Sequence, residues 1–186
     1  MVQGRGIDAS LNENGIAQAK QAGLAFNSID FDRVYTSELI RTKETIGQFI
    51  TNGTPISSLA GFDEISWGNQ EGVVASQEAR NLYAETVKGW REGNLELNVG
   101  GGESPLEVME RQKGAMKEVL VGDDANILIC MHGRAMRVLL CWTLNYPLNY
   151  MDGFPHNNCS YYVLNWRNNA FYLNDFNRTD HLNSAS

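Results

Sequence analysis

Residues 125–131, "ANILICM", form a short, continuous apolar run, and this run constrains the fold more than any other stretch of the chain. A strand without alternating polar residues is typical of a parallel sheet whose two faces are both covered by helices. The residues that follow, 134–144, place apolar side chains at helical spacing, so a helix is expected directly after the strand. This stretch therefore predicts an α/β fold with helices on both faces of the sheet.

Helix and strand patterns alternate along the rest of the chain. Helices are expected over residues 12–27, from 38 to about 50, from about 76 to 95 and from 105 to about 120. Strands are expected at "DRVYTS" (32–37) and at "SYYVLNW" and "AFYLNDF", which flank "RNN" as a β-hairpin, and residues 60–75 are expected to form a loop. We expect a single domain over residues 1–186, built as a three-layer α/β/α arrangement with a mainly parallel sheet.

Charge and composition exclude several classes of partner. The net charge of -7 leaves no general basic face, so neither nucleic acid nor an anionic membrane surface is expected to bind. The opening residues lack a signal-peptide pattern and no run approaches the ~20 apolar residues of a membrane span, so a cytoplasmic location is expected. The three cysteines lack zinc-ligand spacing and an even count, so no disulfide framework or zinc site is expected. No cluster of His, Asp and Glu has ligand spacing, so no metal is expected, and no cofactor is expected either.

Polar residues follow two of the predicted strands, at the edge where α/β proteins bind their ligands. His132 and Gly133 end the apolar strand, and Ser37 ends the earlier one. Arg41 lies one helical turn beyond Ser37, close to a helix N-terminus that already favours an anion. Arginine donates two hydrogen bonds to two phosphate oxygens, and a histidine beside it can bind the same group or transfer a proton. The four residues therefore predict a phosphate-binding site.

Four motifs in order carry a resemblance to a known family. They are "VYTSELIRTKET" (34–45), "DEISWGNQEG" (63–72), "GGGES" (100–104) with Arg111 downstream, and "ILICMHG" (127–133). In this order and spacing they resemble the histidine phosphatase superfamily, the phosphoglycerate mutase-like proteins, over nearly the whole chain up to Cys159. The resemblance implies a metal-independent enzyme in which one histidine takes up a phosphoryl group as phosphohistidine.

The resemblance also implies roles for individual residues. His132 matches the second histidine of the phosphate pocket, Arg41 its second arginine, and Glu64 the acid that protonates the leaving group. An apolar setting beside Ile65 and Trp67 would favour the protonated form of Glu64, whereas the alternative is a solvated loop acid.

Other residues of these motifs have weaker assignments. Asp63 and Glu71 are competing acids near Glu64. Arg5 follows the position of the first motif and is expected at the edge of the pocket, where it would bind substrate with Gly133 and Ser37. His156 is expected to be structural or to lie at the pocket rim.

The family's first motif, Arg-His-Gly at the end of a first strand, has no counterpart in this sequence. We expect that about 20 residues are absent, including a strand of about 5 to 6 residues. Either Met1 is an internal methionine of a longer natural chain, or the start site of the sequence is misplaced. The chain as printed would then lack the nucleophile and be inactive. Without this strand, the neighbouring strands would have unpaired backbone groups. A strand exchanged between two copies, giving a homodimer, could pair with them.

Three functions remain open at this point. The first is a phosphomonoesterase, a hydrolase acting on a small phosphorylated metabolite. The second is a phosphoglycerate mutase, which the absence of basic residues after Glu64 disfavours. The third is a non-catalytic protein that binds a phosphorylated ligand or inorganic phosphate.

Overall fold

The computed structural model describes residues 2–50, 53–74 and 76–183. Its helices are α1 (Glu13–Phe26), α2 (Ile40–Ile46), α3 (Gln77–Arg91), α4 (Pro105–Val119) and α5 (Gly133–Thr143). Its strands are β1 (Arg33–Thr36), β2 (Ile56–Ser58), β3 (Ile127–Cys130), β4 (Tyr161–Arg167) and β5 (Ala170–Arg178). The predicted α/β class is confirmed, and four of the five strands lie where the sequence patterns place them.

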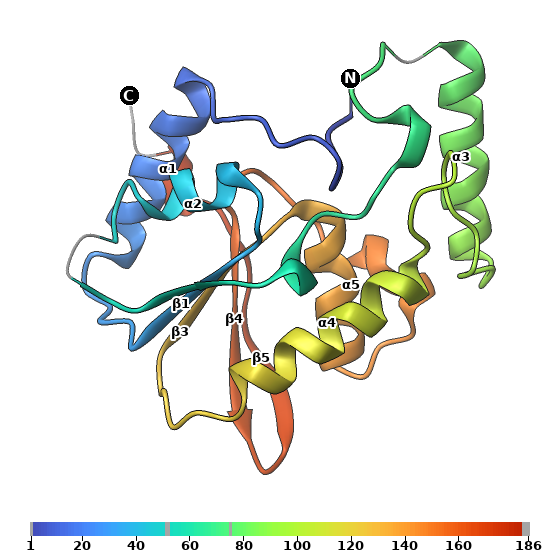
Figure 1. The fold of residues 1–186 in the computed structure, drawn as a ribbon. Coiled ribbons are helices and arrows are strands. Elements are labelled where there is room, and N and C mark those ends of the chain that lie inside the picture. The colour runs from blue at the N-terminus through green and yellow to red at the C-terminus, as the bar shows by residue number, and fades with distance from the viewer. Residues whose placement is uncertain (1, 51–52, 75, 184–186) are drawn as a thin grey trace.

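Three of the strands form a parallel sheet in the order β2-β1-β3, and the other two form a separate hairpin (Figure 1). The central strand β1 is aligned so that Val34 lies between Ile56 of β2 and Leu128 of β3. The strand β2 was not predicted from the sequence. It has only three residues, of which two are exposed, so it carries no apolar run.

Helices cover the sheet on both faces. In Figure 1, α1 and α2 lie on one side of β1 and β3, and α4 and α5 lie on the other. On the second side, Tyr35 of β1 packs in one apolar cluster with Met116 and Val119 of α4 and Leu139 of α5. This burial of both faces explains why the β3 segment is continuously apolar.

Local signals fix the beginnings of the helices. The Asn12 side chain accepts a hydrogen bond of 2.8 Å from the Gly15 amide at the start of α1. Ser104 and Glu107 form the predicted capping box at the start of α4. The helix α2 is shorter than expected, because the amides of Gln48 and Phe49, just after Ile46, bond to the i−3 carbonyls of Thr45 and Ile46 and so interrupt the i−4 pattern.

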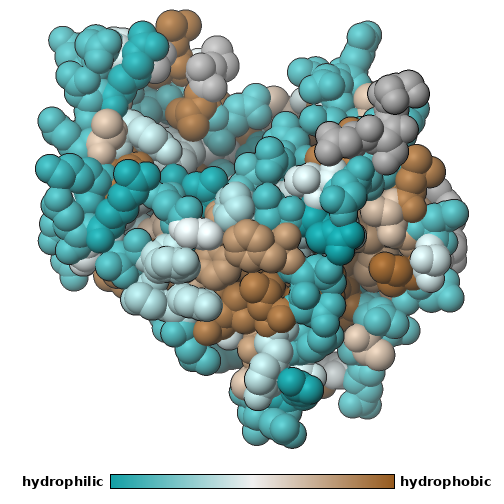
Figure 2. Space-filling view, turned by 180° about the vertical axis from the view of Figure 1, so that it is seen from behind, coloured by the Kyte–Doolittle hydropathy of each residue, from teal (hydrophilic) through white to brown (hydrophobic). Residues whose placement is uncertain are grey.

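The hairpin turns at Asn168 and Asn169, whose φ values of 50° and 58° suit the two-residue turn that matches strand twist. Figure 2, which shows the molecule from behind, has apolar surface near its middle and a hollow at its upper edge between two lobes. Exposed apolar side chains of the hairpin include Leu173 and Phe176. None of the helices in the described ranges is long and apolar enough to cross a membrane.

Candidate phosphate site

His132 lies just after β3 and occupies the N-cap position of α5, without a capping hydrogen bond from its side chain. It is 9% exposed, its Nδ1 accepts a hydrogen bond of 3.2 Å from Arg41 Nε, and its Nε2 lies 2.8 Å from Ser37 Oγ. Because a guanidinium only donates, Nδ1 carries no proton, and Nε2 is therefore the nitrogen that donates to Ser37. Burial, and then the charge of Arg41, lower the pKa of His132 to about 3, so the ring is neutral near pH 7.

Ser37 holds the ring of His132 in place. Its side chain is fully buried, and its hydroxyl lies 2.9 Å from Thr42 Oγ1 and accepts a bond of 3.2 Å from the Leu39 amide. The hydroxyl therefore joins the end of β1, the start of α2 and the end of β3. In this structure Ser37 supports the histidine, and its contact with a substrate stays a prediction.

Arg41, in the first turn of α2, connects His132 to the N-terminal segment. Its Nη1 donates to the Ile7 carbonyl at 2.7 Å and its Nη2 to the Gly4 carbonyl at 3.2 Å. Burial lowers its pKa, a tendency that the negative charge of Glu64 opposes. The sequence-based expectation that Arg41 and His132 lie side by side agrees with this geometry.

Glu64 is 9% exposed, so the reading of it as a solvated loop acid is wrong. Its Oε1 accepts hydrogen bonds of 2.9 Å from the amides of Ile65 and Ala135, and its Oε2 accepts one of 3.1 Å from the Arg134 amide. Two of these three donors are free amides at the N-terminus of α5, where the helix favours a negative charge. The Glu64 carboxylate therefore lies at the start of α5, next to the N-cap residue His132, and occupies the place where these amides would bind an anion.

The competing acids hold the loops around the site. Asp63 accepts from the Glu38 amide at 2.8 Å and from Arg5 Nε at 3.1 Å. Burial raises the pKa of Asp63, although the bond from Glu38 and the charge of Arg5 oppose that rise. Glu71 accepts from the amides of Gly6 and Trp67, both at 2.7 Å. Arg5 therefore lies at the edge of the site, paired with Asp63.

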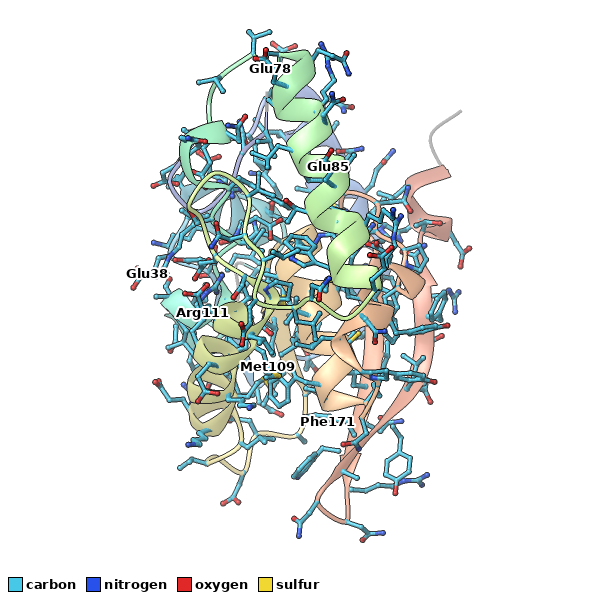
Figure 3. The ribbon with its side chains drawn as sticks, turned by 90° about the vertical axis from the view of Figure 1, so that its right-hand side faces the viewer. Glu38, Glu78, Glu85, Met109, Arg111 and Phe171 are labelled. Carbon is cyan, nitrogen blue, oxygen red and sulfur yellow. The ribbon has the colours of Figure 1, made fainter. Side chains whose placement is uncertain are left out.

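Arg111 and Glu103 carry a structural role that the sequence did not assign to them. Arg111, labelled on α4 in Figure 3, donates to the Glu64 carbonyl at 3.0 Å and the Gly61 carbonyl at 2.9 Å. It also forms two hydrogen bonds to the Glu103 carboxylate, at 2.9 and 3.1 Å, and that carboxylate accepts from the Ser66 amide. Together they fix the loop that carries Glu64, and the signal for this pair was the "GGGES" stretch before a helix.

Gly133 and Arg134 differ from what their place after β3 suggests. A Cβ atom at Gly133 would lie 2.9 Å from the ring of His156, so the space that the glycine leaves open is taken by this ring. Burial lowers the pKa of His156, with a further contribution from Arg137. The Arg134 side chain turns away from His132 to pair with Asp152 at 2.6 Å.

These groups meet at one end of a large cavity. The cavity of about 1140 Å³ is lined by Arg41, Glu64, His132, Gly133 and His156 at this end and continues between β3 and β4. Within the described ranges, no group of three or more His, Cys, Asp or Glu side chains could hold a metal ion. Arg41 offers a charged donor here and neutral His132 offers an Nε2 proton, two groups of the kind that can bind an anion.

Comparison with known families gives a match over most of the chain. A family model described as "Histidine phosphatase superfamily (branch 1)" matches residues 1–179. The matched segment includes every residue of the site described above.

Curated relatives include both phosphatases and mutases. The chain is 27% identical over 178 residues to phosphoserine phosphatase 1 of Hydrogenobacter thermophilus, covering 95% of this chain and 84% of the relative. It is 27% identical over 140 residues to a 2,3-bisphosphoglycerate-dependent phosphoglycerate mutase of Gloeobacter violaceus, covering 72% of this chain and 64% of that protein.

Solved structures share the fold at lower identity. A mycobacterial glucosyl-3-phosphoglycerate phosphatase in complex with inorganic phosphate superposes with a TM-score of 0.84 at 20% identity, covering 97% of this chain and 92% of that one. The alpha-ribazole phosphatase of Shigella flexneri superposes with a TM-score of 0.79 at 20% identity, covering 96% and 88%.

Proposed function

Because the chain belongs to branch 1 of the histidine phosphatase superfamily, whose members are phosphatases or mutases, we propose that it is a phosphomonoesterase acting on small phosphorylated metabolites. The observation that carries the proposal is the contact between Arg41 and neutral His132 at the carboxyl end of β3. A permanent cation and a hydrogen-bond donor at this position suit the oxygens of a phosphoryl group.

Both side chains can transfer their hydrogen bonds to a bound phosphoryl group. The Nε2 proton of His132 is available, because Ser37 retains its bonds with Thr42 and Leu39 when that proton turns to another acceptor. Arg41 loses at most its bonds to two backbone carbonyls, which water or the phosphoryl group can replace. Phosphate binding therefore needs no rearrangement of the strands.

The nucleophile in this proposal is a histidine other than His132. Both ring nitrogens of His132 are engaged, one accepting from Arg41 and one donating to Ser37. We assign the nucleophile to the histidine of the Arg-His-Gly motif that the family resemblance implies and that the printed sequence does not contain. Its ring nitrogen attacks phosphorus while the ester P–O bond breaks, and water then attacks the phosphohistidine to release inorganic phosphate and restore the histidine.

Glu64 is proposed as the proton donor to the leaving oxygen. Its carboxyl group shares the amides of Arg134 and Ala135 with any anion that approaches the start of α5. A phosphoryl oxygen that takes over these donors frees the carboxyl group of Glu64 to bond to the leaving oxygen, the position from which a general acid acts. Water is activated by the same carboxylate in the second step.

A mutase is the second candidate, because curated relatives carry that name. The loop after Glu64 contributes aromatic rather than basic side chains: the Trp67 ring packs 5.3 Å from Tyr83 and 6.2 Å from Trp90. A phosphoglycerate substrate presents a carboxylate, which basic residues would recognise. The aromatic surroundings favour the phosphatase.

The test uses the protein isolated from its own cells, after its intact mass is compared with the 20.7 kDa of the printed chain. We expect a larger mass, hydrolysis of phosphomonoesters and an acid-labile phosphohistidine trapped during turnover. Arg41→Ala and His132→Ala should each lower turnover by about a hundredfold or more, as loss of preorganised charge stabilisation does. The matched controls Arg33→Ala and His181→Ala remove residues that pair with Asp124 and with the Cys159 carbonyl, so they should retain activity.

Near-normal turnover in either site variant would refute the assignment of the site. Interconversion of phosphoglycerates faster than their hydrolysis would identify a mutase instead. A mass of 20.7 kDa together with phosphate binding and no turnover would identify a non-catalytic phosphate-binding protein.

A further inference from the structure

His156 lies in the wall of the cavity, at the same end as the candidate phosphate-binding residues. The cavity of about 1140 Å³ is lined there by Arg41, Glu64, His132 and His156. The His156 ring lies against Gly133, and Gly133 directly follows His132 in the chain. Because consecutive Cα atoms are about 3.8 Å apart, the ring is close to the side chain that would bind a phosphoryl oxygen.

The orientation of the His156 ring is fixed by its neighbours. A Cβ atom at Gly133 would meet Cε1 and Nδ1 of the ring at 2.9 Å and Cγ at 3.1 Å, so the Nδ1 edge lies over the glycine. The chain before the ring is anchored as well, because Phe154 is buried and the Pro155 carbonyl accepts a hydrogen bond of 2.7 Å from the Tyr162 hydroxyl. Nε2 therefore lies on the side of the ring away from Gly133.

Neither ring nitrogen of His156 has a hydrogen-bond partner among the residues that the structure describes. The other two histidines differ, since His132 is bonded through both nitrogens and Nε2 of His181 lies 3.0 Å from the Cys159 carbonyl. Polar groups withdrawn from water normally have a partner in the protein, in ordered water or in a ligand. A half-buried imidazole with two unused nitrogens in a cavity wall is therefore available to a ligand.

The His156 ring is neutral near pH 7. Burial lowers its pKa, and the charge of Arg137 lowers that pKa further. A neutral imidazole has one N–H donor and one acceptor nitrogen. Arg41 only donates, and His132 donates through Nε2. His156 adds to these two donors a neutral group that can also accept.

The acceptor nitrogen of His156 limits the chemistry of its ligand. The oxygens of an ionised phosphomonoester only accept hydrogen bonds, so this nitrogen needs a donor from another part of the substrate. An ammonium group could donate, but it would lie beside the positive charge of Arg137. Glu64, the acid at this end of the cavity, has both oxygens bonded to backbone amides. A neutral hydroxyl group, which donates and accepts, fits this place best.

We propose that His156 binds a hydroxyl group of the substrate, and that the substrates of this site are phosphomonoesters of polyhydroxy compounds with that hydroxyl close to the phosphoester. The proposal rests on the proposed function, because a phosphoryl group bound by Arg41 and His132 would bring the hydroxyl to His156. In this role His156 determines specificity and takes no part in the transfer of the phosphoryl group.

The test compares three phosphomonoesters that share a three-carbon chain. Propyl phosphate has no hydroxyl group, glycerol 3-phosphate has two, and O-phosphoserine has an ammonium and a carboxylate group instead. Dissociation constants are measured by NMR titration near pH 7 for the printed chain and for His156→Phe and His156→Gln, after circular dichroism has shown that each is folded. Phenylalanine keeps a ring against Gly133 without the nitrogens, whereas glutamine keeps a donor and an acceptor.

We expect glycerol 3-phosphate to bind about three- to tenfold more tightly than propyl phosphate, which is the effect of one hydrogen bond. His156→Phe should bring the ratio of the two dissociation constants close to one, and His156→Gln should restore it in part. O-Phosphoserine should bind no more tightly than propyl phosphate. A purely structural role of His156 would change both affinities together and leave their ratio as it was. If His156→Phe does not fold, His156→Ala gives the same comparison.

A ratio that is the same in the printed chain and in His156→Phe would overturn the proposal, since the hydroxyl would then be recognised elsewhere. A ratio near one in the printed chain would overturn it as well, and so would tighter binding of O-phosphoserine than of glycerol 3-phosphate. In each of these cases, binding of propyl phosphate would leave the phosphate site in place. Absence of binding by all three compounds would refute the phosphate site, and with it both the proposed function and the role of His156.

Discussion

Replacement of Glu64 by glutamine tests whether the carboxylate caps α5 as the structure indicates. The carboxylate accepts three backbone hydrogen bonds, from Ile65, Arg134 and Ala135. Glutamine keeps one oxygen, which can still accept the two bonds made by Oε1. Its amide nitrogen would face the Arg134 amide, so two donors would oppose each other in a buried place.

The expected loss of stability follows from these contacts. A hydrogen bond to a charged group contributes about 1.5 to 3 kcal/mol, and a charge at a partly buried helix end contributes up to ~2 kcal/mol. Because the glutamine retains some bonding, we expect Glu64→Gln to lower the free energy of unfolding by about 2 to 3 kcal/mol. Urea denaturation followed by circular dichroism at neutral pH measures this value, and the slope of the transition should be unchanged.

The matched control is Glu85→Gln on α3, whose side chain is exposed (Figure 3). It should change the free energy of unfolding by no more than about 0.5 kcal/mol, as surface substitutions usually do. Equal stability of the Glu64→Gln variant and the wild type would refute the capping role. The arrangement from which we derive competition between Glu64 and a phosphoryl group would then be wrong as well.

Three further predictions concern the same region. The pKa of His132 is about 3 in the folded state, below its ordinary 6.5, so the unfolded chain binds the proton first. Stability should be complete above pH 6.5 and fall as the pH drops from 6.5 toward 3, and denaturation of His132→Gln should show a shallower fall. Gly133→Ala should lower the unfolding midpoint, because the new Cβ would meet the ring of His156, and the added change His156→Ala should restore it. Ser104→Ala should cost about 1 kcal/mol in urea denaturation, since it removes the cap of α4. No loss, or no rescue in the second case, would contradict the corresponding contact.

The elements that the sequence predicted well are those with local signals. The apolar run of β3, the cap at Ser104 and the asparagine turn of the hairpin each depend on residues close together in the chain. The strand β2 has no such signal, because its pairing with β1 is made by backbone groups and its residues are mostly exposed. Its existence depends on contacts that sequence periodicity does not report.

The candidate site, like the fold, has parts that the sequence predicted and parts that it did not. Arg41 and His132 were predicted to meet because both follow parallel strands, and such strand ends lie at one edge of a sheet. The position of Glu64 against the amides of Arg134 and Ala135 depends on a loop held by Arg111. No periodic pattern reports the path of a loop, so its burial could not be derived. His156 was expected to be structural or to lie at the pocket rim, but the contact of its ring with Gly133 could not be derived, since residues 154–160 contain no strand or α-helix.

The hydrogen bonds that hold the site come from several separate segments of the chain. Those of His132 come from the end of β1 and from α2, those of Arg41 from the N-terminal segment, and those of Glu64 from its own loop and α5. The contacts named here involve neither β4 nor the space between β3 and β4. A phosphoryl group that reaches these side chains would thus meet groups that are already oriented. Preorganised donors do not have to be reordered when charge develops on a phosphoryl group, and in this arrangement Arg41 and His132 are held in place by the protein alone.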